Sequence, residues 1–117
     1  MKKVQGFIFF MMTGFFLTQL VCAGEPAKLK EPEFKITIKD HVFSPQELKI
    51  PADQKVKLMI ENQDATPEEF ESYQLDREEV VAGHETITVF IGPLNTGKYQ
   101  YKGEMHSDTA QGVIIVE

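Results

Sequence analysis

Cysteine is almost absent from this sequence, which contains a single residue of this type, Cys22. A lone cysteine cannot form an intramolecular disulfide, and it excludes the paired cysteines of thiol redox and zinc sites. The sequence also shows no phosphate-binding loop and no Ser/His/Asp spacing typical of nucleophilic catalysis. We therefore expect no disulfide partner, and the folded chain has to be stabilised by a packed core alone.

Basic residues are also fewer than acidic residues in this sequence. The chain has 12 Lys and Arg against 18 Asp and Glu, a formal net charge of −6. Such an excess of acid repels nucleic acids and anionic membrane surfaces, so we expect no nucleic-acid partner. The same charge attracts cations.

The N-terminus predicts a signal peptide over residues 1–23. Two lysines precede an apolar run over residues 7–21, which is shorter than the roughly 20 apolar residues that span a membrane. We expect cleavage after Ala23 and export to the periplasm. The alternative is a lipoprotein acylated at Cys22, which Val21 disfavours because such sites favour a small residue before the cysteine. Cleavage would leave 10 basic against 18 acidic residues, a net charge of −8.

The remainder of the chain reads as a short tether followed by strands. Residues 24–33 are polar and contain two prolines, which is typical of a flexible tether. Apolar and polar residues then alternate, as in half-buried strands, with turn residues between them. This spacing favours a β-sandwich, although residues 66–79 fit a helical turn as well. The alternating or apolar segments are 34–39, 55–61, 86–91, 99–101 and 113–116.

The closing segment, residues 99–117, resembles that of a cupredoxin. In that family a strand delivers a Cys, then a His a few residues on, then a Met just before a Gly. Here His106 is present, but the Cys position reads Gly103 and the Met position reads Gln111. Because a blue-copper site needs its thiolate, we expect no blue-copper site.

The resemblance covers nearly all of residues 34–117 and implies one cupredoxin-like domain there, a Greek-key β-sandwich of about seven strands. Residues 34–51 resemble the first two strands of the family, and residues 55–62 resemble the third.

Three further segments resemble a narrower group, the cupredoxin-like periplasmic partners of bacterial permease-type ferrous iron importers. These segments are 68–79, 90–94 and 103–112. The resemblance implies an iron cargo (Fe²⁺/Fe³⁺), with copper as a second metal the site could take. It also implies partners, namely a membrane iron permease and other periplasmic iron-uptake components.

The first predicted ligands are two carboxylates. The resemblance places Glu69 at the position of the first cupredoxin ligand, with Glu71 two residues on. In a strand these two point to one side while Phe70 points to the core. Together they could hold a hard cation, whereas the alternative is a solvated acidic edge around Glu68 and Glu69.

The second group of predicted ligands lies in the closing loop. His106 matches the C-terminal ligand of the family, and neutral imidazole binds Fe, Cu and Zn. Met105 offers a thioether suited to Cu(I), and the alternative is a gap-filling role. Glu104 is a weaker donor in the same loop.

Two residues from other strands complete the candidates. His41 follows the first predicted strand, at the end of the sandwich where metal loops should gather, and its alternative is an exposed turn. Met59 is a weaker candidate on a face shared with Lys57 and Glu61.

These residues support three hypotheses about function. The first is a periplasmic protein of ferrous iron uptake that binds Fe(II) and presents or oxidises it for a permease. Whether it is an enzyme is open, because oxidation requires a separate electron acceptor. The second is a periplasmic copper chaperone or buffer without catalysis. The third is a cupredoxin relic that binds no metal and serves only as an interaction module.

Overall fold

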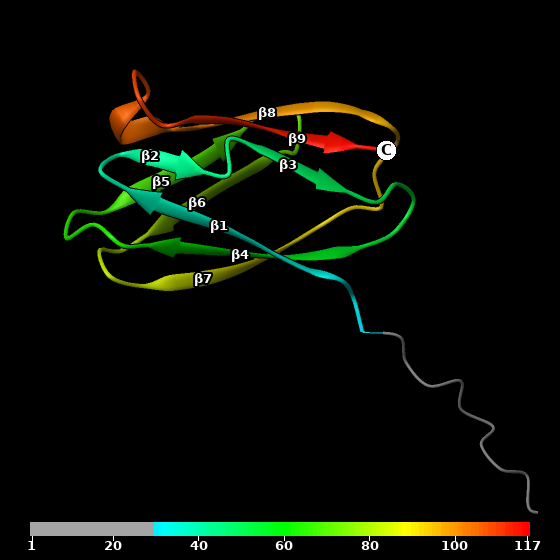
Figure 1. The fold of residues 1–117 in the computed structure, drawn as a ribbon, viewed down its shortest axis with the longest axis horizontal. Coiled ribbons are helices and arrows are strands. Elements are labelled where there is room, and N and C mark those ends of the chain that lie inside the picture. Colours follow the sequence, from blue (N-terminus) through cyan, green and yellow to red (C-terminus); the bar gives the residue numbers. More distant parts are fainter. Residues whose placement is uncertain (1–29) are drawn as a thin grey trace, which may run out of the picture.

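Nine strands form two facing sheets in the computed structural model, which describes residues 30–117 (Figure 1). The four-stranded sheet has the order β2-β1-β4-β7, with strands β1 (Glu33–Lys39), β2 (Val42–Ser44), β4 (Val56–Asn62) and β7 (Thr86–Ile91). The five-stranded sheet has the order β3-β9-β8-β5-β6, with strands β3 (Glu47–Ile50), β9 (Gln111–Val116), β8 (Gly97–Gly103), β5 (Glu68–Ser72) and β6 (Arg77–Val81). One 3₁₀ turn, η1 (Glu104–His106), interrupts the strands of the described region.

The predicted all-β sandwich is confirmed, with more strands than the seven expected. Residues 66–79, for which a helical turn was the alternative, instead form the β5–β6 hairpin. Strand β1 pairs in parallel with β4, and β3 in parallel with β9, while the other pairs are antiparallel. The predicted signal peptide (1–23), its cleavage site and most of the tether lie outside the described residues.

The core follows from the alternation of side chains along each strand. Ile36, Ile38, Leu58 and Ile60 are fully buried between the sheets, while the residues between them face outward. No helix among residues 30–117 has the length and apolar character needed to cross a membrane.

Three aromatic side chains pack beneath one end of the sandwich. The ring of Phe43 packs edge-on against those of Tyr101 and Phe70, at centroid distances of 5.0 and 6.2 Å. All three rings are buried. Each lies two residues from a loop-end position, namely His41, Glu68 or Gly103. This buried aromatic cluster therefore supports the residues at that end of the sandwich from the core side.

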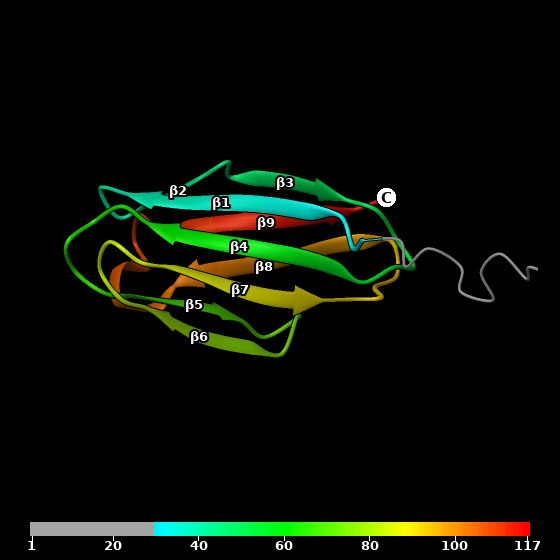
Figure 2. The ribbon, with the colours of Figure 1, turned by 90° about the horizontal axis from the view of Figure 1, so that it is seen from below.

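The connections at this end bring distant parts of the chain together. In two perpendicular views, the β1–β2 turn, the β4–β5 loop and η1 lie at the end opposite the C-terminus (Figures 1 and 2). Any site formed there combines residues from the beginning, middle and end of the described chain.

Candidate metal centre

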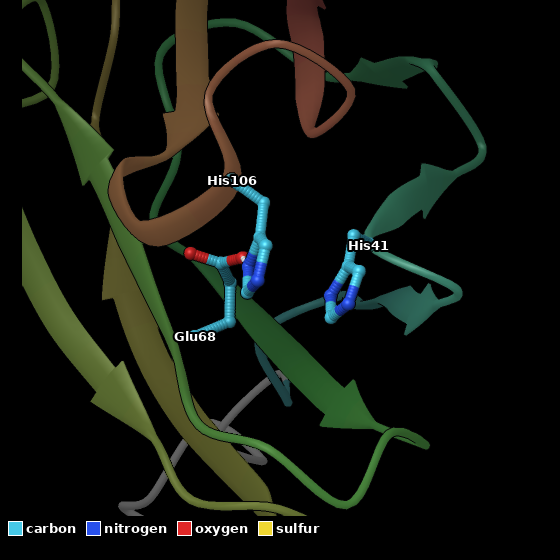
Figure 3. Close-up of side chains that lie close together, drawn as sticks. All are labelled: His41, Glu68 and His106. Carbon is cyan, nitrogen blue, oxygen red and sulfur yellow. Dashed lines mark hydrogen bonds and ion pairs between the residues drawn. The ribbon is translucent and has the colours of Figure 1, made fainter.

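Three potential metal ligands meet at the loop end of the sandwich. His41 lies in the β1–β2 turn, Glu68 begins β5, and His106 ends η1 (Figure 3). Each offers one donor atom, and these atoms lie within 4.8 Å of one another. Two imidazoles and one carboxylate can therefore reach a single ion.

Glu68 is the buried member of this group, with only 1% of its surface exposed. Buried carboxylates are rare unless they are paired with donors. Its Oε1 accepts the backbone N–H groups of Met105 (2.9 Å) and Glu69 (3.0 Å). Its Oε2 lies 2.6 Å from Nδ1 of His106, and the two atoms are hydrogen-bonded. The carboxylate is thus fixed in orientation, and the loop around η1 is fixed to it.

His41 is held against His106 by stacking. The two rings are nearly parallel, at an interplanar angle of 12° and a centroid distance of 3.5 Å. The His41 and His106 side chains are 40% and 31% exposed, so solvent reaches both rings. A metal ion could therefore enter from the solvent side while Glu68 closes the inner side.

The backbone at His41 is also fixed. Asp40 and His41 adopt left-handed φ values of 51° and 59°, which non-glycine residues rarely adopt. Both of their backbone N–H groups donate to the carboxylate of Asp64, at 2.7 and 3.0 Å. Thr109 Oγ1 donates to the His41 carbonyl at 2.7 Å.

Asp64 also lies beside the imidazole of His41, with 3.5 Å between Oδ2 and Nδ1. Partial burial opposes ionisation of Asp64, but the two backbone N–H groups and the nearby histidines lower its pKa. An ionised carboxylate next to a ligand imidazole is the usual outer partner of a metal-binding histidine.

The predicted pair Glu69 and Glu71 does lie on one side of β5, but the structure does not bring it to His106. The side chains of Glu69, Glu71 and Glu78 form a separate group on the outer face of the five-stranded sheet. Strand alternation explains the error, because Phe70 points to the core and Glu68, not Glu69, shares its side. The structure therefore groups Glu68, and not Glu69 or Glu71, with His41 and His106.

Glu104 interacts with Glu71 of this outer group. It forms an ion pair of 3.2 Å with Lys102. A hydrogen bond to Glu104 raises the pKa of Glu71, and the interactions with Glu71 and Lys102 lower the pKa of Glu104.

Neither predicted methionine is placed as an inward-facing sulfur donor. Met105 is 47% exposed, and it contributes to the centre through its backbone N–H. Met59 alternates with the buried Leu58 and Ile60, so it lies on the outer face of the four-stranded sheet.

The donor set fits some metals better than others. Two imidazole nitrogens and a carboxylate oxygen suit iron, copper(II) or zinc, and a set of this kind with open positions is typical of non-haem Fe(II). It does not fit a blue-copper ion, since the only cysteine is Cys22 and position 103 is glycine.

Comparison with known proteins identifies the family. A family model described as "Cupredoxin-like domain" matches residues 7–116. The chain belongs to the cupredoxin-like family. Uncharacterized protein RP394 of Rickettsia prowazekii (strain Madrid E) is 52% identical over 84 residues, which cover 72% of this cupredoxin-like chain and 67% of that protein.

Solved structures share the fold of this cupredoxin-like protein at low sequence identity. Auracyanin A, a "blue" copper protein of Chloroflexus aurantiacus, aligns with a TM-score of 0.64 at 16% identity, over 75% of this chain and 100% of that one. Amicyanin of Paracoccus versutus aligns with a TM-score of 0.59 at 18% identity, over 78% and 87% of the two chains. A purple cupredoxin of Nitrosopumilus maritimus gives 0.55 at 17% identity, over 74% and 100%. The predicted cupredoxin-like fold is confirmed.

Proposed function

We propose that this cupredoxin-like protein binds Fe(II) at His41, Glu68 and His106 and presents it to a membrane iron permease. The observation that carries the proposal is the convergence of these three side chains within 4.8 Å. The protein would act in the periplasm, after export by the predicted signal peptide.

Iron is favoured by the chemistry of the donors. A carboxylate is a hard ligand and imidazole is borderline, whereas Cu(I) prefers thiolate and thioether sulfur. Two backbone N–H groups orient Glu68 through Oε1, and Oε2, which is hydrogen-bonded to His106 Nδ1, is the oxygen that would bind the ion. Carboxylate ligation also favours Fe(III) over Fe(II), which makes oxidation of the cargo easier. The electron would pass to an acceptor supplied by a partner.

The exposure of the site suits delivery as well as capture. The two imidazoles are partly open to solvent, and the chain is acidic overall. An acidic carrier raises the local concentration of cations, and an exposed site allows transfer to a receptor by direct contact.

A copper chaperone is the second candidate. Auracyanin A, which shares the fold, is a "blue" copper protein, and Met105 lies next to His106 with its side chain half exposed. This alternative predicts Cu(I) binding that depends on Met105 and is indifferent to Glu68.

The proposal is tested by titrating the purified protein anaerobically with Fe(II) and with Cu(I) and measuring each binding event by calorimetry. We expect Fe(II) binding that weakens at least tenfold in Glu68→Gln, because the variant keeps the shape of the side chain but loses the anionic ligand. Glu69→Gln is the matched control, since it changes the neighbouring carboxylate on the opposite side of β5, and Fe(II) affinity should stay within about twofold.

Two results would overturn the iron proposal. One is an absence of Fe(II) binding in the wild-type protein. The other is tight Cu(I) binding that persists in Glu68→Gln and is lost in Met105→Leu. If His106→Ala changes neither metal affinity nor iron uptake by cells, the protein acts as an interaction module without metal.

A further inference from the structure

Gly103 lies directly against the Glu68 carboxylate. A Cβ atom added at position 103 would lie 2.6 Å from Cδ of Glu68 and 2.8 Å from its Oε1. It would also lie 2.7 Å from Cβ of Ala110. These separations are shorter than van der Waals contact, so the carboxylate occupies the space that any side chain at position 103 would need.

The requirement for glycine here is one of space and not of backbone conformation. Gly103 has φ −89° and ψ 111°, an extended conformation that every residue type adopts readily. Its lack of a side chain is therefore explained by what lies beside it. In β8, position 103 alternates with Tyr101 on the inner face, so a side chain there would point toward Glu68.

Neither the backbone of Gly103 nor the side chain of Glu68 can move away easily. The backbone of Gly103 pairs with Phe70 in the sheet, and its N–H donates to the Ala110 carbonyl at 2.8 Å. Glu68 is held by Met105 and Glu69 backbone groups and by His106. Displacing the carboxylate would break three hydrogen bonds at once.

We propose that Gly103 is the specificity-determining residue of the centre, because its bare backbone admits the Glu68 carboxylate as the third donor. A side chain at position 103 and the carboxylate of Glu68 exclude each other. The identity of residue 103 thus decides whether the centre holds a hard oxygen donor, suited to Fe(II), or a different donor. This inference rests on the proposed metal site.

The first test is a double-mutant cycle between Gly103→Ala and Glu68→Ala. Both substitutions are made in an Ala110→Gly background, which removes the second contact of the new methyl group. Fe(II) affinity is measured by anaerobic calorimetry, and the visible spectrum of bound Co(II) reports the ligand set. We expect Gly103→Ala to weaken Fe(II) binding by at least tenfold and to give the Co(II) spectrum of Glu68→Ala. In the chain that already has Glu68→Ala, adding Gly103→Ala should change Fe(II) affinity by less than about twofold.

The second test exchanges the donor class. The chain with Gly103→Cys, Glu68→Ala and Ala110→Gly should gain an intense thiolate-to-Cu(II) charge-transfer absorption, which Gly103→Cys with Glu68 retained should lack or show only weakly. Circular dichroism checks the fold of each variant. If Gly103→Ala prevents folding and Glu68→Ala restores it, that rescue itself supports mutual exclusion.

The outcomes separate the two proposals. If the wild-type protein binds Fe(II) but the losses from Gly103→Ala and Glu68→Ala add, or if Gly103→Ala in the Ala110→Gly background keeps wild-type affinity, the role of Gly103 is overturned and the metal site stands. If the wild-type protein binds neither Fe(II) nor Co(II), the proposed function fails, and the role of Gly103 fails with it.

Discussion

Single carboxylates in this protein differ in what surrounds them, and that difference decides what each can do. Glu68 is buried, and its carboxylate oxygens are hydrogen-bonded to two backbone N–H groups and to His106. Glu71 is also largely buried, but its neighbours include the carboxylates of Glu69, Glu78 and Glu104. We therefore expect Glu68 to bind cations and Glu71 to destabilise the fold when it is ionised.

The effect of Glu71 depends on pH. Because Glu104 raises its pKa in the folded protein, the protonated form of Glu71 is favoured by folding. That contribution is fully present below the unfolded pKa, about 4.3, and is lost as the pH rises through the folded pKa. Glu71→Gln should therefore raise the melting temperature by a few degrees near pH 7 and leave it unchanged near pH 3.5. Thermal denaturation followed by circular dichroism across this range measures the difference.

Glu47→Gln provides the control for that series. Glu47 is an exposed residue of the same sheet, and its substitution should shift the melting temperature little at any pH. A melting temperature of Glu71→Gln that falls below wild type at pH 7 would contradict the expected repulsion.

At the residue scale, the sequence predicted His41 and His106 as candidates, but the carboxylate that lies beside them is Glu68 and not Glu69. The information needed was present, because a core Phe70 implies that residue 68 shares its side of the strand. The family resemblance assigned Glu69 to the ligand position instead. What alternation could not supply was the burial of Glu68, which depends on the space beside Gly103.

At the scale of elements, the β1–β2 turn is held by a residue that is distant in the sequence, Asp64. Its two central residues adopt left-handed backbone conformations, and both N–H groups donate to Asp64 in the β4–β5 loop. Asp64 N–H in turn donates to Asn62 Oδ1 at 3.0 Å. The position of His41 is thus set by the β4–β5 loop as well as by its own turn.

Asp64→Ala should loosen this turn. Loss of a charged acceptor for two backbone N–H groups costs about 2 kcal/mol, equivalent to a drop of roughly 10 °C in melting temperature. Fe(II) affinity should fall as well, because His41 loses its orientation. Chemical denaturation and calorimetry measure the two effects. Glu47→Ala is the control, since Glu47 is an exposed acidic residue of β3 in the other sheet. Unchanged stability in Asp64→Ala would show that the turn holds without it.

The strands with clear alternation were predictable, and those without it were not. Residues 34–39 and 56–61 alternate strictly, and they form β1 and β4. The β5–β6 hairpin was missed as a definite element because its carboxylates obscure the pattern. Glu68 and Glu71 are buried in β5, although acidic side chains ordinarily indicate an exposed position.

For the molecule as a whole, the proposed site would link metal binding to folding. The proposed ligands come from the two sheets, so an ion at this centre would hold the sheets together and would be lost on unfolding. Free Fe(II) at a hundred times its dissociation constant adds about 2.7 kcal/mol to the stability, or roughly 10 to 20 °C in melting temperature. Anaerobic thermal denaturation with and without Fe(II) measures this shift. His106→Ala should abolish it, and a shift that persists in His106→Ala would place the ion elsewhere.

The order of the proposed ligands along the chain determines when, during folding, the centre can take up metal. Glu68 and His106 are 38 residues apart along the chain. Strand β9, which follows His106, pairs with both β3 and β8. A chain without β9 keeps the three side chains of the proposed centre but lacks the strand that pairs with β8, which leads into η1. Metal loading of the proposed centre would therefore be restricted to molecules in which β9 has paired, and a bound ion would mark a folded protein.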